Sequence, residues 1–183
     1  MIPPERRALL DARAIDRALQ SIAQEIVNFA GGTERLALVG IERRGTELAD
    51  RISALIKETE GAEVPRGGMD ITLYRDDLET VGPKPIVGET HIPFHLDGKV
   101  VVIVDDVLYT GRTIRAALDQ LADFGRPARI GLAVLVDRGG RELPIQADIV
   151  GVKVDAAHGD VVDVLVSELD DRDAVELVPR GDP

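Results

Sequence analysis

Residues 100–113 read VVVIVDDVLYTGRT, and this stretch decides the fold class. Its first part is an uninterrupted run of aliphatic residues, most of them β-branched, which is typical of a strand buried on both faces. A short loop containing Gly111 follows, and apolar residues then recur at Ile114, Leu118 and Leu121, the spacing of a helix. A buried strand that leads through a tight loop into a helix predicts an α/β protein with a parallel sheet.

The same alternation extends along the chain in both directions. Expected helices cover residues 11–30, 45–60 and 111–124. Expected strands cover residues 36–41, 69–74, 99–107 and 128–136, and shorter apolar runs lie at 147–154, 161–166 and 174–178. Residues 75–98 are polar and contain several glycines and prolines, and a loop of this length in a small domain is usually functional or mobile. The pattern predicts an α/β domain with helices on both faces of a parallel sheet.

Composition limits the class of protein further. The chain has 183 residues, enough for one compact domain. The absence of cysteine excludes disulfides, thiolate zinc sites and a cysteine nucleophile, and three histidines leave little room for a histidine-rich metal site. The net charge of −11 disfavours unspecific binding of nucleic-acid backbones by the chain as a whole. No apolar run approaches the roughly 20 residues of a membrane span, so we expect a soluble, cytoplasmic protein with no membrane partner.

The residues from Asp105 to Thr113 carry the chemistry. Ligands of a parallel sheet bind at the carboxyl ends of its strands, and a helix N-terminus offers unpaired N–H groups to an anion. Gly111 allows a close approach of the backbone and the two threonine hydroxyls add donors, so the loop suits a phosphate group. The acceptor oxygens of Asp105 and Asp106 suit the hydroxyls of an attached sugar. For a strand–loop–helix in general, helix-capping acids and a turn glycine are an equally good interpretation.

The whole string resembles the phosphoribosyl pyrophosphate (PRPP) signature of type I phosphoribosyltransferases: four hydrophobic residues, two acids, two hydrophobic residues, a variable residue and Thr-Gly-x-Thr. The resemblance implies one domain over residues 1–183, with a central, mainly parallel sheet flanked by helices. A small hood formed by about residues 138–183 and a flexible loop at about 75–98 complete that fold. The signature residues expected at the 5′-phosphate of PRPP are Tyr109, Thr110, Gly111, Arg112 and Thr113.

The family also has a pyrophosphate-binding loop after its first sheet strand, and the sequence GIERRG stands there at residues 40–45. The resemblance implies that Arg43 and Arg44 bind the diphosphate through charge-assisted hydrogen bonds, joined by Arg75 when the flexible loop closes. Without the resemblance, two adjacent arginines would more often be a solvated helix start. Catalysis is expected to be electrostatic, with Arg44 acting beside the acid pair and no covalent nucleophile. Mg²⁺ is expected as a cofactor held through PRPP, without ligands from side chains.

Three further features indicate which phosphoribosyltransferase this is. Purine salvage enzymes of the class carry an acid where this chain has Tyr109. The strings DITLYRDDL at 70–78 and DRGGRELPIQA at 137–147 resemble the PyrR family, bifunctional pyrimidine operon regulators and uracil phosphoribosyltransferases. The resemblance implies the reaction of uracil with PRPP to give UMP and diphosphate. It places Arg138 and the backbone near Val162 at the base.

The second role of that family is binding of a pyrimidine-operon leader RNA in the presence of UMP or UTP, by a homodimer or higher homo-oligomer. The residues expected at the RNA are Arg17, Arg138 and Arg141. The chain departs from the usual basic or polar pattern on that face at Gln20, Ser21, Gln24, Gly140 and Gln146. Two alternatives therefore stay open: a phosphoribosyltransferase without an RNA-regulatory role, and a non-catalytic nucleotide sensor that binds RNA only.

Overall fold

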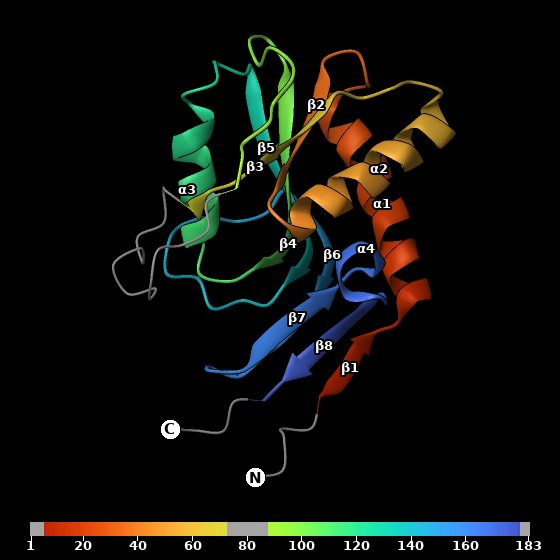
Figure 1. Ribbon diagram of the computed structural model, residues 1–183, viewed down its shortest axis with the longest axis vertical. Helices are drawn as coiled ribbons and strands as arrows, with labels where there is room; N and C mark the ends of the chain where they lie inside the picture. Colours follow the sequence, from red (N-terminus) through yellow and green to blue (C-terminus); the bar gives the residue numbers. More distant parts are fainter. Residues whose placement is uncertain (1–5, 73–87, 180–183) are drawn as a thin grey trace.

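The computed structural model describes residues 6–72 and 88–179, which form two sheets and four helices (Figure 1). The helices are α1 (Ala12–Ala30), α2 (Arg44–Glu60), α3 (Arg112–Leu121) and α4 (Ser167–Asp170). The strands are β1 (Arg7–Leu10), β2 (Leu36–Ile41), β3 (Arg66–Met69), β4 (Val100–Leu108), β5 (Arg129–Asp137), β6 (Ile149–Lys153), β7 (Val161–Leu165) and β8 (Ala174–Val178).

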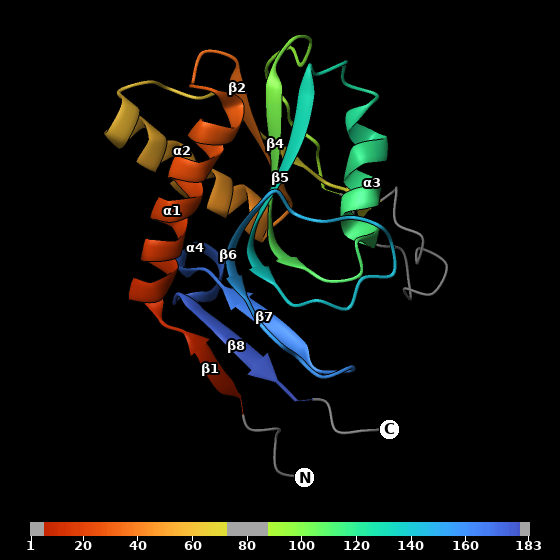
Figure 2. The same cartoon turned by 180° about the vertical axis from the view of Figure 1, so that it is seen from behind.

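The main sheet has five parallel strands in the order β3-β2-β4-β5-β6. The helices α1 and α2 cover one face and α3 covers the other, as Figures 1 and 2 show from opposite sides. Val102 and Val104 of β4 belong to the core under α1 and α2, whereas Val101 and Ile103 belong to the core under α3. Strand β4 is therefore buried on both faces, and each fully buried aliphatic side chain of this kind contributes about 1.5–3 kcal/mol.

The small sheet lies at the carboxyl ends of the main-sheet strands and has the antiparallel order β1-β8-β7 (Figure 1). The predicted hood over residues 138–183 therefore differs from the structure in two respects. Strand β6 lies inside that range but pairs with β5 in the main sheet, and the N-terminal strand β1 completes the small sheet. The sequence did not indicate β1, because it has only four residues and its register shifts between Ala8 and Leu10.

The structure places one strand earlier than the sequence predicts. Alternation predicted a strand over 69–74, but β3 ends at Met69. Gly67 and Gly68 lie inside β3. Glycine is required at position 67, because a β-carbon there would come within 2.7 Å of the carbonyl oxygen of His91. A glycine pair is an ordinary signal for a turn, and here it permits a close approach of another backbone instead. The other predicted helices and strands are confirmed, with ends shifted by a few residues.

Part of the stretch predicted as a flexible loop is packed against the sheet. Residues 75–87 lie outside the described residues, whereas residues 88–98 are described. The backbones of Gly68 and His91 exchange two hydrogen bonds, and Leu96 is buried in the core under α3. The described end of the stretch is therefore fixed to the protein. No helix in ranges 6–72 and 88–179 is long and apolar enough to cross a membrane.

Candidate active site

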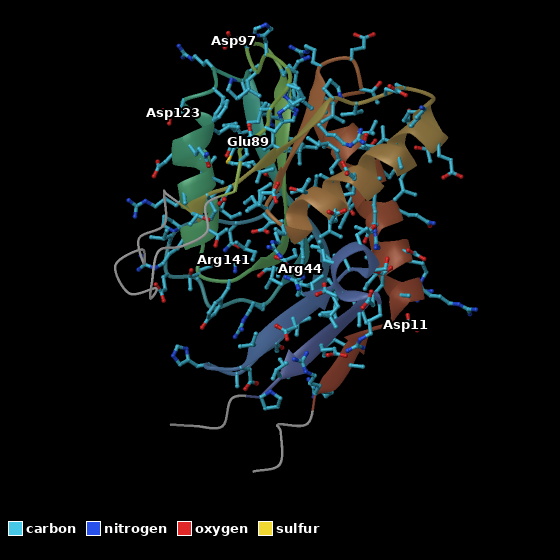
Figure 3. All side chains as sticks on the ribbon, in the orientation of Figure 1. Asp11, Arg44, Glu89, Asp97, Asp123 and Arg141 are labelled. Carbon is cyan, nitrogen blue, oxygen red and sulfur yellow. The ribbon has the colours of Figure 1, made fainter. Side chains whose placement is uncertain are left out.

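The candidate site lies where the carboxyl ends of β2, β4 and β5 face the small sheet. Three segments meet there: residues 41–45, which run from the end of β2 into the first turn of α2; residues 109–111 before α3; and residues 138–146 after β5. In open parallel sheets this edge is where ligands bind. Figure 3 shows Arg44 and Arg141 at this edge, while Asp97 and Asp123 lie at the opposite end of the molecule.

Two glycines allow the loop before α2 to approach the end of β4. A β-carbon at Gly40 would lie 2.5 Å from the carbonyl oxygen of Gly45, and one at Gly45 would lie 2.5 Å from the carbonyl oxygen of Val104. Distances this short exclude any side chain at either position without movement of the backbone. The glycines therefore hold the first turn of α2 directly beside the acid pair that follows Val104.

Asp105 and Asp106 are adjacent in β4, and no cation within ranges 6–72 and 88–179 forms an ion pair with either carboxylate. Asp105 is 6% exposed, and its Oδ1 accepts a hydrogen bond of 2.9 Å from the backbone N–H of Asp106. Asp106 Oδ1 accepts one of 2.7 Å from the N–H of Val107. Burial and the neighbouring charge of Asp106 raise the pKa of Asp105 well above its ordinary value. Burial also raises the pKa of Asp106, although the charge of Arg44 acts against that shift.

The loop before α3 has the features of an anion-binding helix N-terminus. Gly111 precedes the helix with a φ of +92°, a backbone conformation that other residues rarely adopt. Gly111, the N-cap residue, has no side chain to cap the first turn, and that turn contains no acidic residue. The hydroxyl oxygen of Thr110 accepts a hydrogen bond of 3.3 Å from the N–H of Arg112. The helix dipole and the N–H groups of the first turn therefore face the edge of the sheet, and the turn itself carries no acid that would repel an anion.

Residues 138–146 contact the loop before α3 from the other side, mainly through backbone groups. The carbonyl oxygen of Thr110 accepts hydrogen bonds of 3.0 and 3.1 Å from the N–H groups of Glu142 and Leu143. A β-carbon at Gly111 would lie 3.3 Å from the side chain of Ile145, so the two loops are in contact. The loop after β5 thereby fixes the path of the backbone at the start of α3.

Arg141 joins the same two loops with its guanidinium. It donates to the carbonyl oxygens of Tyr109 (2.9 Å) and Ile145 (2.8 Å) and to a carboxylate oxygen of Asp137 (2.6 Å). Its side chain is 14% exposed. Burial alone would raise the pKa of Asp137, but the hydrogen bonds from Arg141 and from the N–H of Gly139 lower it below its ordinary value. Arg141 is therefore an internal support of the loops in this structure.

Arg138 and Tyr109 form a stacked pair in the same region. The guanidinium carbon of Arg138 lies 3.9 Å from the centre of the Tyr109 ring. Arg138 also donates to the carbonyl oxygens of Ala157 and Asp160 and is 7% exposed. Its Nε is buried and has no hydrogen-bond partner among residues 6–72 and 88–179. A β-carbon at Gly140 would lie 2.4 Å from the Tyr109 ring, so only glycine fits there beside this ring position.

Two arginines of α2 bind the short helix α4 of the hood region. Arg44 donates from Nε and Nη2 to the two carboxylate oxygens of Asp170, at 3.2 and 2.8 Å. Arg51 binds Asp173 (2.8 Å) and Glu168. These contacts join segments more than a hundred residues apart, so no local pattern could have revealed them. The only signal was the density of acids in residues 167–173, which reads equally well as a solvated surface.

The structure brings some of the predicted site residues together and separates others. The signature residues 109–113, the acid pair and Arg44 surround one edge of the sheet. Arg43 is exposed at the start of α2, and Val162 is buried in β7 of the small sheet. Arg75 lies outside the described residues. Arg17 is exposed on α1, whereas the guanidinium groups of Arg138 and Arg141 are directed at internal partners.

The described residues offer no ready-made metal cage. Among residues 6–72 and 88–179, no group of three or more His, Asp or Glu side chains is arranged to hold a metal ion. The acid pair on β4 supplies carboxylate oxygens, which suit a hard cation such as Mg²⁺. Two carboxylates alone leave most coordination positions of such an ion to water and to a bound ligand.

Comparison with known proteins gives one consistent family. A model of the phosphoribosyl transferase domain matches residues 5–166 of this chain. The bifunctional protein PyrR of Thermus thermophilus is 61% identical over 172 residues, which cover 94% of this chain and 95% of the relative. The bifunctional protein PyrR of Deinococcus radiodurans is 54% identical over 177 residues, which cover 97% of each chain.

Solved structures agree on the fold. A hypoxanthine-guanine phosphoribosyltransferase from Bacillus anthracis matches with a TM-score of 0.72 at 17% identity, over 95% of this chain and 98% of that chain. A hypoxanthine phosphoribosyltransferase from Trypanosoma cruzi matches with a TM-score of 0.73 at 22% identity, over 97% and 96% of the two chains. At these identities the likeness shows a shared architecture and leaves the choice of base to other observations.

Proposed function

This chain belongs to the phosphoribosyl transferase family and, within it, to the bifunctional PyrR proteins, and from that premise we propose that it transfers the phosphoribosyl group of PRPP to uracil. The products are UMP and diphosphate. The observation that carries the proposal is the placement of two adjacent acids, of which Asp105 is buried, beside a helix N-terminus without an acid in its first turn. A sugar phosphate needs both a hydroxyl acceptor and an anion site, and here the acids at the end of β4 are followed directly by the loop before α3.

Each part of PRPP has a matching part of the site. The 5′-phosphate binds the loop and helix start at residues 109–113, where N–H groups and threonine hydroxyls are donors. The ribose hydroxyls donate to Asp105 and Asp106. The diphosphate binds the loop at residues 40–45 with Arg43 and Arg44, whose guanidinium groups suit phosphate oxygens. Arg75 is proposed to join them from the stretch outside the described residues.

Uracil is proposed to bind beside Arg138 and the backbone near Val162. Arg138 supports this placement because it has one buried donor, Nε, that no described residue uses. Its stacking on Tyr109 also supports it, since the ring stands at the position that separates this chain from purine enzymes of the class. A planar base with a fixed pattern of donors and acceptors is read by a few such groups.

The chemistry follows from charge. The bond between the anomeric carbon of ribose and the diphosphate oxygen breaks, the bond to N1 of uracil forms, and the N1 proton leaves to solvent. Positive charge that grows on the ribose is stabilised by Asp105 and Asp106, and negative charge on the leaving diphosphate by Arg44. When Mg²⁺ is bound through PRPP oxygens, it neutralises part of the leaving-group charge. No side chain needs to act as a covalent nucleophile.

We further propose that the protein binds pyrimidine-operon leader RNA in response to UMP or UTP, as a homodimer or higher homo-oligomer in the cytoplasm. The observation that favours this function is the exposed polar side chains Arg13, Arg17, Gln20 and Gln24, which share one face of α1 by their spacing. Arg138 and Arg141 have internal partners, so α1 carries more of this proposal than the loop after β5 does.

Two assays on one preparation test both functions. The first measures UMP formation from uracil and PRPP, with orotate and hypoxanthine as competing bases. The second measures binding of a labelled leader transcript with and without UMP over a salt series, for the wild type and for Arg17→Ala. Uracil-specific turnover with RNA binding that weakens in Arg17→Ala supports the two roles together. Turnover without RNA binding leaves a salvage enzyme, and RNA binding without turnover leaves a nucleotide sensor.

A further inference from the structure

Arg44 and Asp170 form a pair of parallel hydrogen bonds, here called the fork, which fixes the direction of the Arg44 guanidinium beside the candidate diphosphate site. Nε and Nη2 of Arg44 each face one carboxylate oxygen of Asp170, at 3.2 and 2.8 Å. Paired hydrogen bonds of this kind set the plane of the group as well as its position. Within the part of the chain that the structure describes, Nη1 has no hydrogen-bond partner, so this side of the fork still has donors to offer.

Asp170 is itself held rigidly. Its Oδ2 accepts a hydrogen bond of 2.9 Å from the N–H of Val166, and its own N–H donates 2.7 Å to the carbonyl oxygen of Val166. Val166 is fully buried and directly follows β7. The hydrogen bond from Val166 and the contact with Arg44 hold the pKa of Asp170 below its ordinary value. The carboxylate is therefore charged throughout the neutral range and fixed to the core through one backbone contact.

The fork is not needed to attach α4 to the rest of the protein. Arg51 already joins α2 to this segment through Glu168, Asp173 and the hydroxyl of Ser167. Its side chain is 18% exposed, against 35% for Arg44. Arg51 thus has the contacts and the burial of a structural anchor. The hydrogen bonds from Arg44 to Asp170 are therefore available to orient the Arg44 guanidinium.

Arg44 interacts with Asp170 on one side and with the charge of Asp106 on the other. It is the first residue of α2 and lies within the segment of residues 40–45, and its charge lowers the pKa of Asp106. Figure 3 shows it at the start of α2, above the small sheet. An arginine side chain that is mobile in the free protein must be immobilised when an anion binds, and this reduces affinity. A side chain that is already fixed avoids that loss.

We propose that Asp170 is a positioning residue that holds Arg44 in place for the diphosphate group of PRPP. The proposal rests on the proposed function, because it takes residues 40–45 as the diphosphate site. Asp170 has no contact with the substrate in this account and acts only through the guanidinium of Arg44. The hood region would thereby influence the diphosphate end of the site as well as the base.

The test compares Asp170→Asn with Asp173→Asn. Both variants remove one negative charge from the same segment, but only the first opens the Arg44 fork. Calorimetry gives the Kd of inorganic pyrophosphate and of PRPP, and steady-state assays give kcat and KM for both substrates. We expect Asp170→Asn to bind pyrophosphate roughly fivefold to tenfold more weakly than Asp173→Asn, the cost of immobilising one long side chain. The KM for PRPP should rise in parallel, with the KM for uracil unchanged.

An Arg44→Ala background shows whether Asp170 acts through Arg44. There the substitution Asp170→Asn should have no further effect on pyrophosphate affinity. Asp170→Glu, which keeps the charge and moves the carboxylate by one methylene, is the second variant if the asparagine variant folds poorly, and it should also weaken pyrophosphate binding. Equal affinities of Asp170→Asn and Asp173→Asn, or a full loss that persists without Arg44, would overturn the positioning role. Absence of PRPP-dependent turnover in the wild type would instead overturn the proposed function.

Discussion

Two groups of carboxylates in this protein have pKa values shifted in opposite directions. On β4, burial and the neighbouring Asp106 raise the pKa of Asp105. On α4 and just after it, hydrogen bonds from Arg51 lower the pKa values of Glu168 and Asp173. A raised carboxyl pKa means that ionisation costs folding free energy at neutral pH, and a lowered one means that ionisation stabilises the fold. The chain thus pairs Glu168 and Asp173 with an arginine, whereas ionisation of Asp105 stays unfavourable in the folded protein.

The difference separates acids that are paired with an arginine of the structure from acids whose oxygens are left available to a ligand. An arginine beside Asp105 would relieve its raised pKa, just as Arg51 does for Asp173, but it would also occupy the acceptor oxygens. Acids that keep unfavourable ionisation at the edge of a parallel sheet are typical of functional sites.

The largest effect is expected from removing the two carboxylates with raised pKa values on β4. The double substitution Asp105→Asn with Asp106→Asn should lower turnover about a thousandfold, because the positive charge on the ribose loses its stabilisation. The same variant should unfold at a higher temperature, since each asparagine keeps the acceptor oxygen but carries no charge. Enzyme assays and calorimetric melting on the same sample measure the two effects. A well-folded variant with near-normal turnover would refute the ribose-binding role.

The pH dependence of that stabilisation has a defined sign. Below a pH of about 4, the ordinary value for aspartate, the acids are protonated in both the folded and unfolded wild type, so variant and wild type should differ little. As pH rises, the unfolded acids ionise first and the folded ones later, so the wild type loses stability relative to the variant. Melting curves between pH 4 and 8 should show a widening gap. A constant gap would contradict the raised pKa of Asp105.

The second effect concerns a neutralised acid beside the site. Arg141→Met should destabilise the protein by about 3 kcal/mol, because Asp137 loses its partner in a largely buried ion pair. Urea unfolding measures the change. The matched control is Arg66→Met, which removes an ion pair with Asp50 that is about half exposed and should cost less than about 1 kcal/mol. Equal costs for the two variants would show that burial of the Arg141 contacts adds nothing.

A smaller effect is expected from two neighbouring glycines that share a backbone conformation but not their surroundings. Gly139 and Gly140 have φ values of +71° and +74°, so alanine is strained at either position. Only at Gly140 does a β-carbon meet the ring of Tyr109. Gly140→Ala should therefore be less stable than Gly139→Ala by about 2 kcal/mol in denaturant unfolding, and it should raise the KM for uracil by moving the ring. Equal stabilities would mean that Tyr109 moves aside freely.

The smallest effect is expected on the α4 side of the comparison. Asp173→Asn should destabilise the protein by about 1 kcal/mol at neutral pH, since Arg51 keeps its second partner, Glu168. The contribution of Asp173 is present above its unfolded pKa of about 4 and is lost as pH falls through its lowered folded value. Urea unfolding at pH 7 and at pH 3 should therefore show a smaller difference at the lower pH. An unchanged difference at pH 3 would contradict the ion pair.

Sequence reasoning predicted the parts of this molecule whose signals are local. The helix over 11–30 and the strand over 36–41 follow from hydrophobic periodicity, and the structure has them at Ala12–Ala30 and Leu36–Ile41. The strand, the short loop with Gly111 and the helix that starts at Arg112 follow from the order of residues in VDDVLYTGRT. Spacing along one segment is enough for such features, because neighbours in the sequence are neighbours in the fold.

Features that depend on distant partners could not be predicted in the same way. Strand β1 pairs only with β8 at the other end of the chain, and Gly68 of β3 finds its partner in His91. The internal roles of Arg141 and Asp170 depend on contacts with Tyr109 and Arg44 that no sequence pattern records. For the same reason Gly140 reads as a missing side chain in the sequence, whereas the structure shows the space already filled by an aromatic ring.

The pairing of β1 with β8 has a consequence for biosynthesis. Arg6 and Glu176, which are 170 positions apart, form an ion pair in this small sheet. During translation the strands of the parallel sheet leave the ribosome one after another and can associate, but β1 has to wait for β8. The entropy lost in closing so long a loop makes this pairing a late event. A chain that lacks the residues from Ala174 onward should therefore be able to form the main sheet and the loop before α3, while the small sheet stays incomplete.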